Sequence, residues 1–123
     1  MDGTDLSAGQ TEALEKHLMA LRQKFLETLA QKEEEVEEAV VTLAAYGLDK
    51  EIVARLYYTA HNLVGMAPMH KFHGLAEVAL RAETLLVKSV MPPHVILELD
   101  EVLIVSDDLA EEIRITLDVH LRG

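Results

Sequence analysis

The sequence predicts an all-α protein, an antiparallel up-down four-helix bundle with elongated first and last helices. Apolar residues recur every three or four positions along most of the chain, which is the period of amphipathic helices. No stretch alternates between apolar and polar residues in the manner of a strand. The chain has 123 residues and half of them are hydrophobic, enough for one core. We therefore expect residues 1–123 to form a single domain, with residues 1–8 as a flexible N-terminus.

The first predicted helix begins near the N-terminus and ends at a glycine. Ser7 and Gln10 have the spacing of a capping box, and Gly47 supplies a residue that tolerates a positive φ angle. Residues 31–35 interrupt the apolar pattern, so the sequence does not decide whether the helix is continuous, kinked or broken there. The expected buried stripe comprises Leu14, Leu18, Leu21, Phe25, Leu29, Val36, Val40 and Leu43.

Three shorter helices are expected to follow. Asp49 is a suitable N-cap for the second helix, and Pro68 closes it. The third runs from about residue 71 to residue 89, and the fourth runs from His94 to the end of the chain, after two prolines. The expected inward positions are Ile52, Val53, Leu56, Ala60, Leu63 and Ala67 in the second helix, Phe72, Leu75, Val78, Ala79, Ala82, Leu85 and Leu86 in the third, and Leu99, Val102, Ser106, Leu109, Ile113, Leu117 and His120 in the fourth.

The connections between these helices are short, which makes neighbouring helices antiparallel. The first and last helices then extend from the same end of the bundle. We expect their extra turns to pair with one another there.

The composition excludes several classes of function. The chain has 22 acidic and 11 basic residues and a formal net charge of −11, which disfavours binding to nucleic acid phosphates. It has no cysteine, so thiolate metal sites and cysteine nucleophiles are excluded. No apolar run approaches the length of a membrane span. Residues 1–9 are polar and acidic, unlike a secretory signal, so we expect a cytoplasmic location.

One histidine stands out from the periodic pattern. At about 100° per residue, His61 lies roughly 130° from the centre of the buried stripe of the second helix, and therefore faces outward. Gly65 follows one turn later, although glycine inside a helix costs about 1 kcal/mol relative to alanine. A missing side chain beside an exposed imidazole leaves room for another molecule to approach the ring. Close packing of two helices at Gly65 is the alternative explanation.

The residues around His61 carry a resemblance to a known family. Residues 59–65, TAHNLVG, together with Ala67, Leu75 and Glu83, resemble the histidine-containing phosphotransfer (HPt) domain pattern. The similarity extends over roughly residues 25–88, and the family fold is a four-helix bundle. The resemblance implies that His61 is the phosphorylated histidine and that Gly65 provides clearance beside it.

The same resemblance implies the chemistry and the partners. The histidine exchanges a phosphoryl group with an aspartate of a response-regulator receiver domain, or with a hybrid histidine kinase that carries one. The receiver holds the Mg²⁺, so we expect no cofactor in this chain. The sequence contains no nucleotide-binding loop, so we expect no autokinase activity.

Two positions near the histidine depart from the family pattern. Val64 stands where a lysine commonly lies beside the phosphoryl group, and Lys71 stands where a glycine is usual. Lys71 is therefore a candidate to supply the missing charge. The alternative hypothesis is an HPt-like helical interaction module that binds a kinase or response regulator without phosphotransfer.

The surface around His61 is the expected docking site for the partner. Tyr57, Tyr58, Pro68 and Met69 are its predicted contact residues, and we expect the chain to act as a monomer. A metal site formed by His61, His70 and His73 is a further alternative, but histidines at this spacing are usually solvated, so no metal site is expected.

Overall fold

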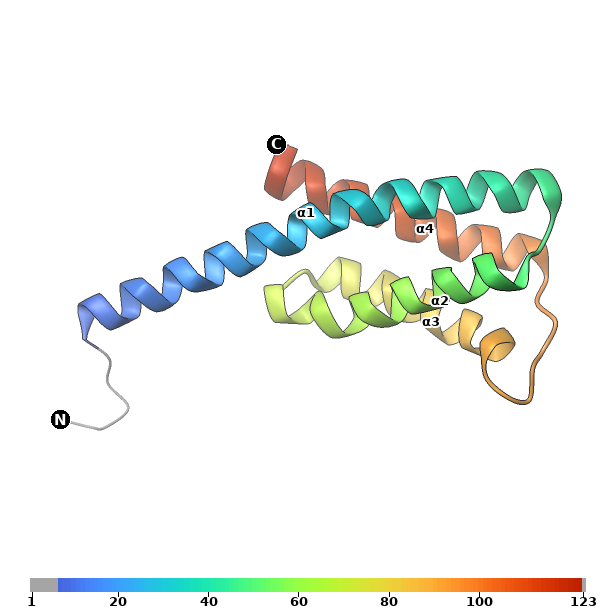
Figure 1. Cartoon of the computed structure of the whole chain (residues 1–123), viewed down its shortest axis with the longest axis horizontal. Coiled ribbons are helices and arrows are strands. Elements are labelled where there is room, and N and C mark those ends of the chain that lie inside the picture. Colours follow the sequence, from blue (N-terminus) through green and yellow to red (C-terminus); the bar gives the residue numbers. More distant parts are fainter. Residues whose placement is uncertain (1–6, 123) are drawn as a thin grey trace.

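A computed structural model describes residues 7–122, which form four helices and contain no strand (Figure 1). The expected all-α class is therefore confirmed for this part of the chain. Of the predicted flexible stretch 1–8, residues 1–6 lie outside the described residues. The helices are α1 (Ala8–Tyr46), α2 (Lys50–Met66), α3 (His73–Val90) and α4 (Leu99–Leu117), with a 3₁₀ turn, η1 (Pro68–His70), between α2 and α3, and a π-helical turn, η2 (Asp118–Arg122), after α4.

The predicted capping residues Ser7, Gln10, Gly47 and Asp49 are confirmed. The Ser7 hydroxyl accepts from the Gln10 backbone N–H at 3.1 Å, and the Gln10 side chain accepts from the Ser7 N–H at 2.9 Å. Gly47 ends α1 with a φ of 89°, where a Cβ would be strained. Asp49 caps α2 by accepting two backbone N–H groups in its first turn. These contacts satisfy backbone groups that have no partner within the helix.

Helix α1 runs through residues 31–35 without a break. Its 39 residues make it much longer than the other three helices. Lys32, the polar residue that interrupts the apolar stripe, lies at the surface and contacts Glu35 at 3.1 Å. An exposed polar residue with good helix propensity does not need to break the helix.

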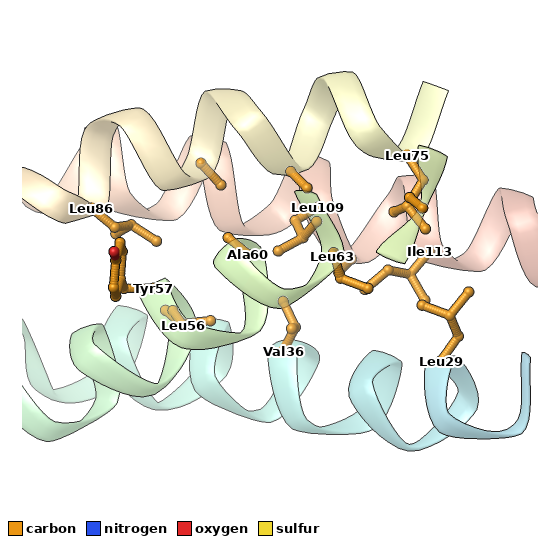
Figure 2. Close-up of a cluster of buried hydrophobic side chains, with 14 of the residues drawn as sticks. Leu29, Val36, Leu56, Tyr57, Ala60, Leu63, Leu75, Leu86, Leu109 and Ile113 are labelled. Atoms are coloured by element: carbon orange, nitrogen blue, oxygen red, sulfur yellow. The ribbon is translucent and has the colours of Figure 1, made fainter. Parts of the chain in front are cut away.

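The core is a single cluster of hydrophobic side chains, most of them aliphatic, to which all four helices contribute (Figure 2). Helix α2 packs mainly against α3, and α4 packs against both α1 and α3. Most of the inward positions predicted for α2, α3 and α4 are buried, whereas Ile52, Val78, Leu85 and Leu99 are half-buried at the edge of the core. The side chains at the centre of the cluster include Leu56, Ala60, Leu63, Leu75, Leu86, Leu109 and Ile113. The prediction for His120 is wrong, because this residue is exposed in η2.

The first turns of α1 do not join this core, which corrects the sequence prediction. Leu14, Leu18 and Leu21 are 47%, 53% and 41% exposed, and in Figure 1 this part of α1 extends beyond the other helices. At the end of the bundle that contains the C-terminus, contacts with α1 extend only to about Arg22. The guanidinium of Arg22 lies 5.7 Å from the centre of the Phe72 ring. The Phe72 ring in turn contacts His120 in η2. Within residues 7–122, the expected pairing of extra turns from the first and last helices is therefore absent.

Helix α4 also begins later than predicted. Residues 91–98 form a loop, in which the Val95 N–H donates to the Lys88 carbonyl at 2.8 Å and the Leu97 side chain is buried. Burying Leu97 anchors the loop to the core, so α4 starts at Leu99 instead of His94. Helix α4 has 19 residues, and η2 continues it directly to Arg122, so the last helical segment is longer than α2 and α3, as predicted. Within residues 7–122, no helix combines the length and apolarity needed to cross a membrane.

Candidate functional site

His61 projects from the surface of α2 toward the neighbouring helix α3. Its side chain is 58% exposed, and its Nδ1 atom lies 2.9 Å from the Oε2 atom of Glu83 on α3. Glu83 is less exposed, at 22%, because it sits at the junction of the two helices. The carboxylate therefore holds one nitrogen of an imidazole that is otherwise open to solvent.

The packing of α2 against α3 sets this geometry. Ala60 and Ala82, the residues that directly precede His61 and Glu83, are fully buried. Their small side chains allow the two helix backbones to approach closely. The next residue on each helix is rotated by about 100° and reaches the edge of the interface, where the two polar side chains meet.

Glu83 and Tyr57 together orient the imidazole. The Tyr57 ring, one helical turn before His61, stacks on it with a centroid distance of 5.8 Å and an interplanar angle of 21°. An ionised carboxylate can only accept a hydrogen bond, so Nδ1 of a neutral His61 carries the proton. The lone pair of the ring is then on Nε2, available for nucleophilic attack or for proton transfer.

Gly65 leaves open space beside this histidine. A Cβ placed on Gly65 would have no neighbouring heavy atom within 4 Å beyond the local helix. The alternative that this glycine allows two helices to pack closely is therefore wrong. The open space at Gly65 is what the clearance hypothesis expects.

The two departures from the family pattern occupy different environments. Val64 is partly buried and packs against the core, so no charged group extends from this position. Lys71 is exposed and follows η1 with a φ of 63°, a left-handed conformation that favours glycine. No hydrogen bond or ion pair joins Lys71 to His61 within residues 7–122.

The predicted docking residues divide between surface and core. Tyr58 is 52% exposed, Met69 is 66% exposed, and Pro68 is also exposed. Tyr57 is only 6% exposed, because its ring fills the space beneath Tyr58 and His61. Tyr57 therefore supports the imidazole from inside, whereas Tyr58, Pro68 and Met69 are accessible to a partner.

The histidines of the alternative metal site do not come together. His70 is buried, with its ring stacked on Phe25 at 4.8 Å, and its carbonyl accepts from the Arg22 guanidinium. Desolvation by burial, with a smaller effect from the Arg22 charge, lowers the pKa of His70. In the described part of the chain, no group of three or more side chains of the ligating types is placed to share a metal ion.

Glu83 was part of the sequence pattern, but its role as a hydrogen-bond partner was missed. Twenty-two residues separate it from His61. The signal that could have found it is its position: like His61, it directly follows an inward-facing alanine on an amphipathic helix. Only the pairing of α2 with α3 brings these two positions to the same level.

Comparisons with known proteins add no assignment. No family model matches this chain, and neither the curated proteins nor the solved structures include a significant match.

Proposed function

We propose that this chain is a histidine phosphotransfer protein that passes a phosphoryl group between receiver-domain aspartates through His61. One observation carries the proposal: an exposed imidazole whose Nδ1 is held by Glu83 and whose Nε2 is free to react. The open space at Gly65 gives a partner access to this nitrogen.

The proposed reaction is a direct phosphoryl transfer. The Nε2 lone pair of His61 attacks the phosphorus of an aspartyl phosphate, an N–P bond forms, and the bond from phosphorus to the aspartate oxygen breaks. The aspartate leaves as a carboxylate. Glu83 stabilises the positive charge that develops on the imidazole by accepting the Nδ1–H hydrogen bond. The reverse reaction passes the group to a second receiver.

The fold suits a partner that supplies the rest of the chemistry. We infer that the four helices run up and down in antiparallel order, as their short connections favour. Tyr58, Pro68 and Met69 are exposed and form the proposed contact surface for a response-regulator receiver domain or a hybrid histidine kinase. The receiver provides the Mg²⁺ and most of the charge stabilisation. The proposed setting is the cytoplasm, with no kinase activity in this chain.

The direct test is a transfer assay with phosphorylated receiver domains. The wild-type chain should acquire label that survives alkali and is lost in acid, as a phosphohistidine does. His61→Gln should acquire none, and His73→Gln, a substitution of another exposed histidine, should behave as the wild type. Equal labelling of His61→Gln, or no labelling of the wild type by any receiver of a broad panel, would refute the proposal.

A second assay tests Glu83 as a positioning residue. Glu83→Ala should slow transfer by about tenfold or more, because the tautomer and orientation of the ring are no longer held. Glu83→Gln keeps an oxygen that can accept the Nδ1–H bond and should restore part of the rate. If both variants lose the same activity, or neither does, the hydrogen bond does not serve the reaction.

The second candidate function is a helical interaction module that binds a kinase or receiver without phosphotransfer. The partly buried Val64 favours it, since no cation stands where the family commonly places one. This hypothesis predicts binding that is unaffected by His61→Ala, together with no label on the wild type. A binding isotherm for both proteins, run beside the transfer assay, distinguishes the two functions.

A further inference from the structure

A hollow with a volume of about 300 Å³ lies between α1 and α2, and η1 borders it at the end of α2. This α1–α2 hollow exists because α1 packs mainly against α4 and α2 packs mainly against α3, so the direct contact between α1 and α2 is slight. His61 meets Glu83 on α3, whereas Asn62 and Met66 of the same helix line the hollow. The hollow is therefore separate from the imidazole and shares only Met69 with the proposed contact surface.

The floor of the α1–α2 hollow is apolar. Phe25, Leu63 and His70 line it and are at most 7% exposed. The ring of His70 stacks on that of Phe25 at a centroid distance of 4.8 Å. Met66 and Met69 stand at the exposed rim, where flexible methionine side chains can adapt to a bound molecule. Such a surface favours a ligand with an apolar body.

The charged side chains that line the hollow are both cationic. Lys24 and Lys32 line it from α1, and in the described part of the chain no aspartate or glutamate does, although the net charge of the protein is −11. Lys32 is paired with Glu35, which lines a neighbouring hollow, at 3.1 Å. Lys24 makes no ion pair within residues 7–122, and Glu27, three residues further on, does not line the hollow. An anionic group would therefore meet an unpaired cation at Lys24.

We propose that the α1–α2 hollow binds a small organic carboxylate with an apolar body, such as a fatty acid of medium length. Burial of the apolar body against the floor supplies most of the binding free energy. The carboxylate lies at the rim beside Lys24, which selects the sign of the charge. A volume of about 300 Å³ is at the lower end of the range for small-molecule sites. A helix, about 10 Å wide with its side chains, could insert only a few of them.

The test is an NMR titration of protein labelled with ¹³C at its methionine methyl groups, with decanoate as the probe at concentrations below micelle formation. The Met66 and Met69 signals should shift and saturate together. Those of Met19 and Met91, which lie outside the hollow, should stay in place. Decanol should bind about fivefold more weakly, because it lacks the ionic contact with an exposed lysine.

Two variants with matched controls test the charge and the space separately. Lys24→Glu should raise the dissociation constant for decanoate about tenfold by replacing attraction with repulsion, whereas Lys88→Glu, at an exposed position of α3, should bind as the wild type does. Thr28→Phe should fill the hollow and abolish saturable binding. Thr84→Phe is its control, since Thr84 is also exposed and its hydroxyl likewise donates to the carbonyl four residues earlier.

Circular dichroism establishes that each variant keeps its helices. Shifts that do not saturate, decanol that binds as tightly as decanoate, or wild-type binding by Lys24→Glu or Thr28→Phe would overturn the proposal. It would also be overturned if the Met66 and Met69 signals moved with protein concentration alone, since a second copy of the chain would then occupy the hollow. None of these measurements depends on phosphotransfer.

Discussion

At the scale of single residues, three neighbours of His61 define the environment of its imidazole. Glu83 sets which nitrogen carries the proton, Tyr57 supports the ring from the core side, and Gly65 leaves the approach open. Each of these residues acts on a different property: tautomer, orientation and access. Substitutions at this site should therefore separate the effect on reactivity from the effect on folding.

Gly65 offers the sharpest separation. Gly65→Leu should leave the free energy of unfolding unchanged or raise it by up to about 1 kcal/mol, because leucine has the higher helix propensity and meets no neighbour. Transfer to His61 should fall steeply, because the new side chain blocks the approach. Thermal unfolding and transfer rate, measured on the same variant, check both effects.

Gly9→Leu is the matched control for this substitution. Gly9 also has no neighbour within 4 Å, but it lies in the first turn of α1, outside the His61 site. This variant should keep wild-type transfer. A Gly65→Leu protein that is strongly destabilised, or that transfers at the normal rate, would contradict the clearance argument.

At the scale of elements, η1 joins α2 to α3 and closes one end of the core. Pro68 cannot continue the hydrogen bonding of α2, and Lys71 turns the chain with a positive φ. Between them, His70 is buried against Phe25, and its carbonyl accepts from Arg22 on α1. The turn is thus fixed by one aromatic contact and one hydrogen bond to α1.

This arrangement makes the stability of the fold sensitive to pH. Because the pKa of His70 is lowered in the folded protein, the unfolded chain binds a proton more readily. The free energy of unfolding should therefore decrease as the pH falls below 6.5, the ordinary value for histidine, and His70 should contribute no such change above it. Denaturant unfolding at a series of pH values between 5 and 8 measures this slope.

His70→Phe should flatten that slope, because phenylalanine can stack on Phe25 without taking up a proton. His73→Gln removes an exposed histidine three residues away and should leave the slope as it is in the wild type. A slope that persists in His70→Phe would show that another group titrates.

At the scale of the whole molecule, the core covers only part of the length of α1. Leu29, Val36 and Leu43 are at most 1% exposed, whereas Leu14 and Leu18 in the first turns of the helix are about half exposed. The same apolar stripe of one helix therefore changes its role along its length. Its later turns hold the fold together, and its first turns lie outside the core.

Two leucine substitutions test this division. Leu29→Ala should lower the free energy of unfolding by about 2–5 kcal/mol, because it leaves a cavity in the packed core. Leu14→Ala should change it by less than about 0.5 kcal/mol, as is usual at a surface position. Chemical denaturation measures both. Equal losses would mean that the first turns of α1 are packed in solution.

Local patterns in the sequence were sufficient for the helices and for most of their buried faces. The cap residues Ser7 and Asp49, the turn at Gly47 and the inward positions of α2 to α4 each depend on neighbours within a few residues, so they could be predicted. The same periodicity could not show where the core ends, because an apolar stripe looks alike whether or not another helix covers it. The predicted burial of Leu14 and the predicted start of α4 at His94 were therefore wrong.

The features of the candidate site also divide into those that the local sequence predicts and those that depend on the tertiary structure. His61 and Gly65 could be singled out from their positions on one helix, because an outward-facing histidine and a glycine one turn later are local features. The hydrogen bond to Glu83 and the burial of Tyr57 could not, since both depend on which helix lies beside α2 and at what level. The sequence by itself determined the candidate side chain and its helix. Only the tertiary structure decided which nitrogen of that side chain is free, because the partner that holds the other nitrogen comes from a different helix.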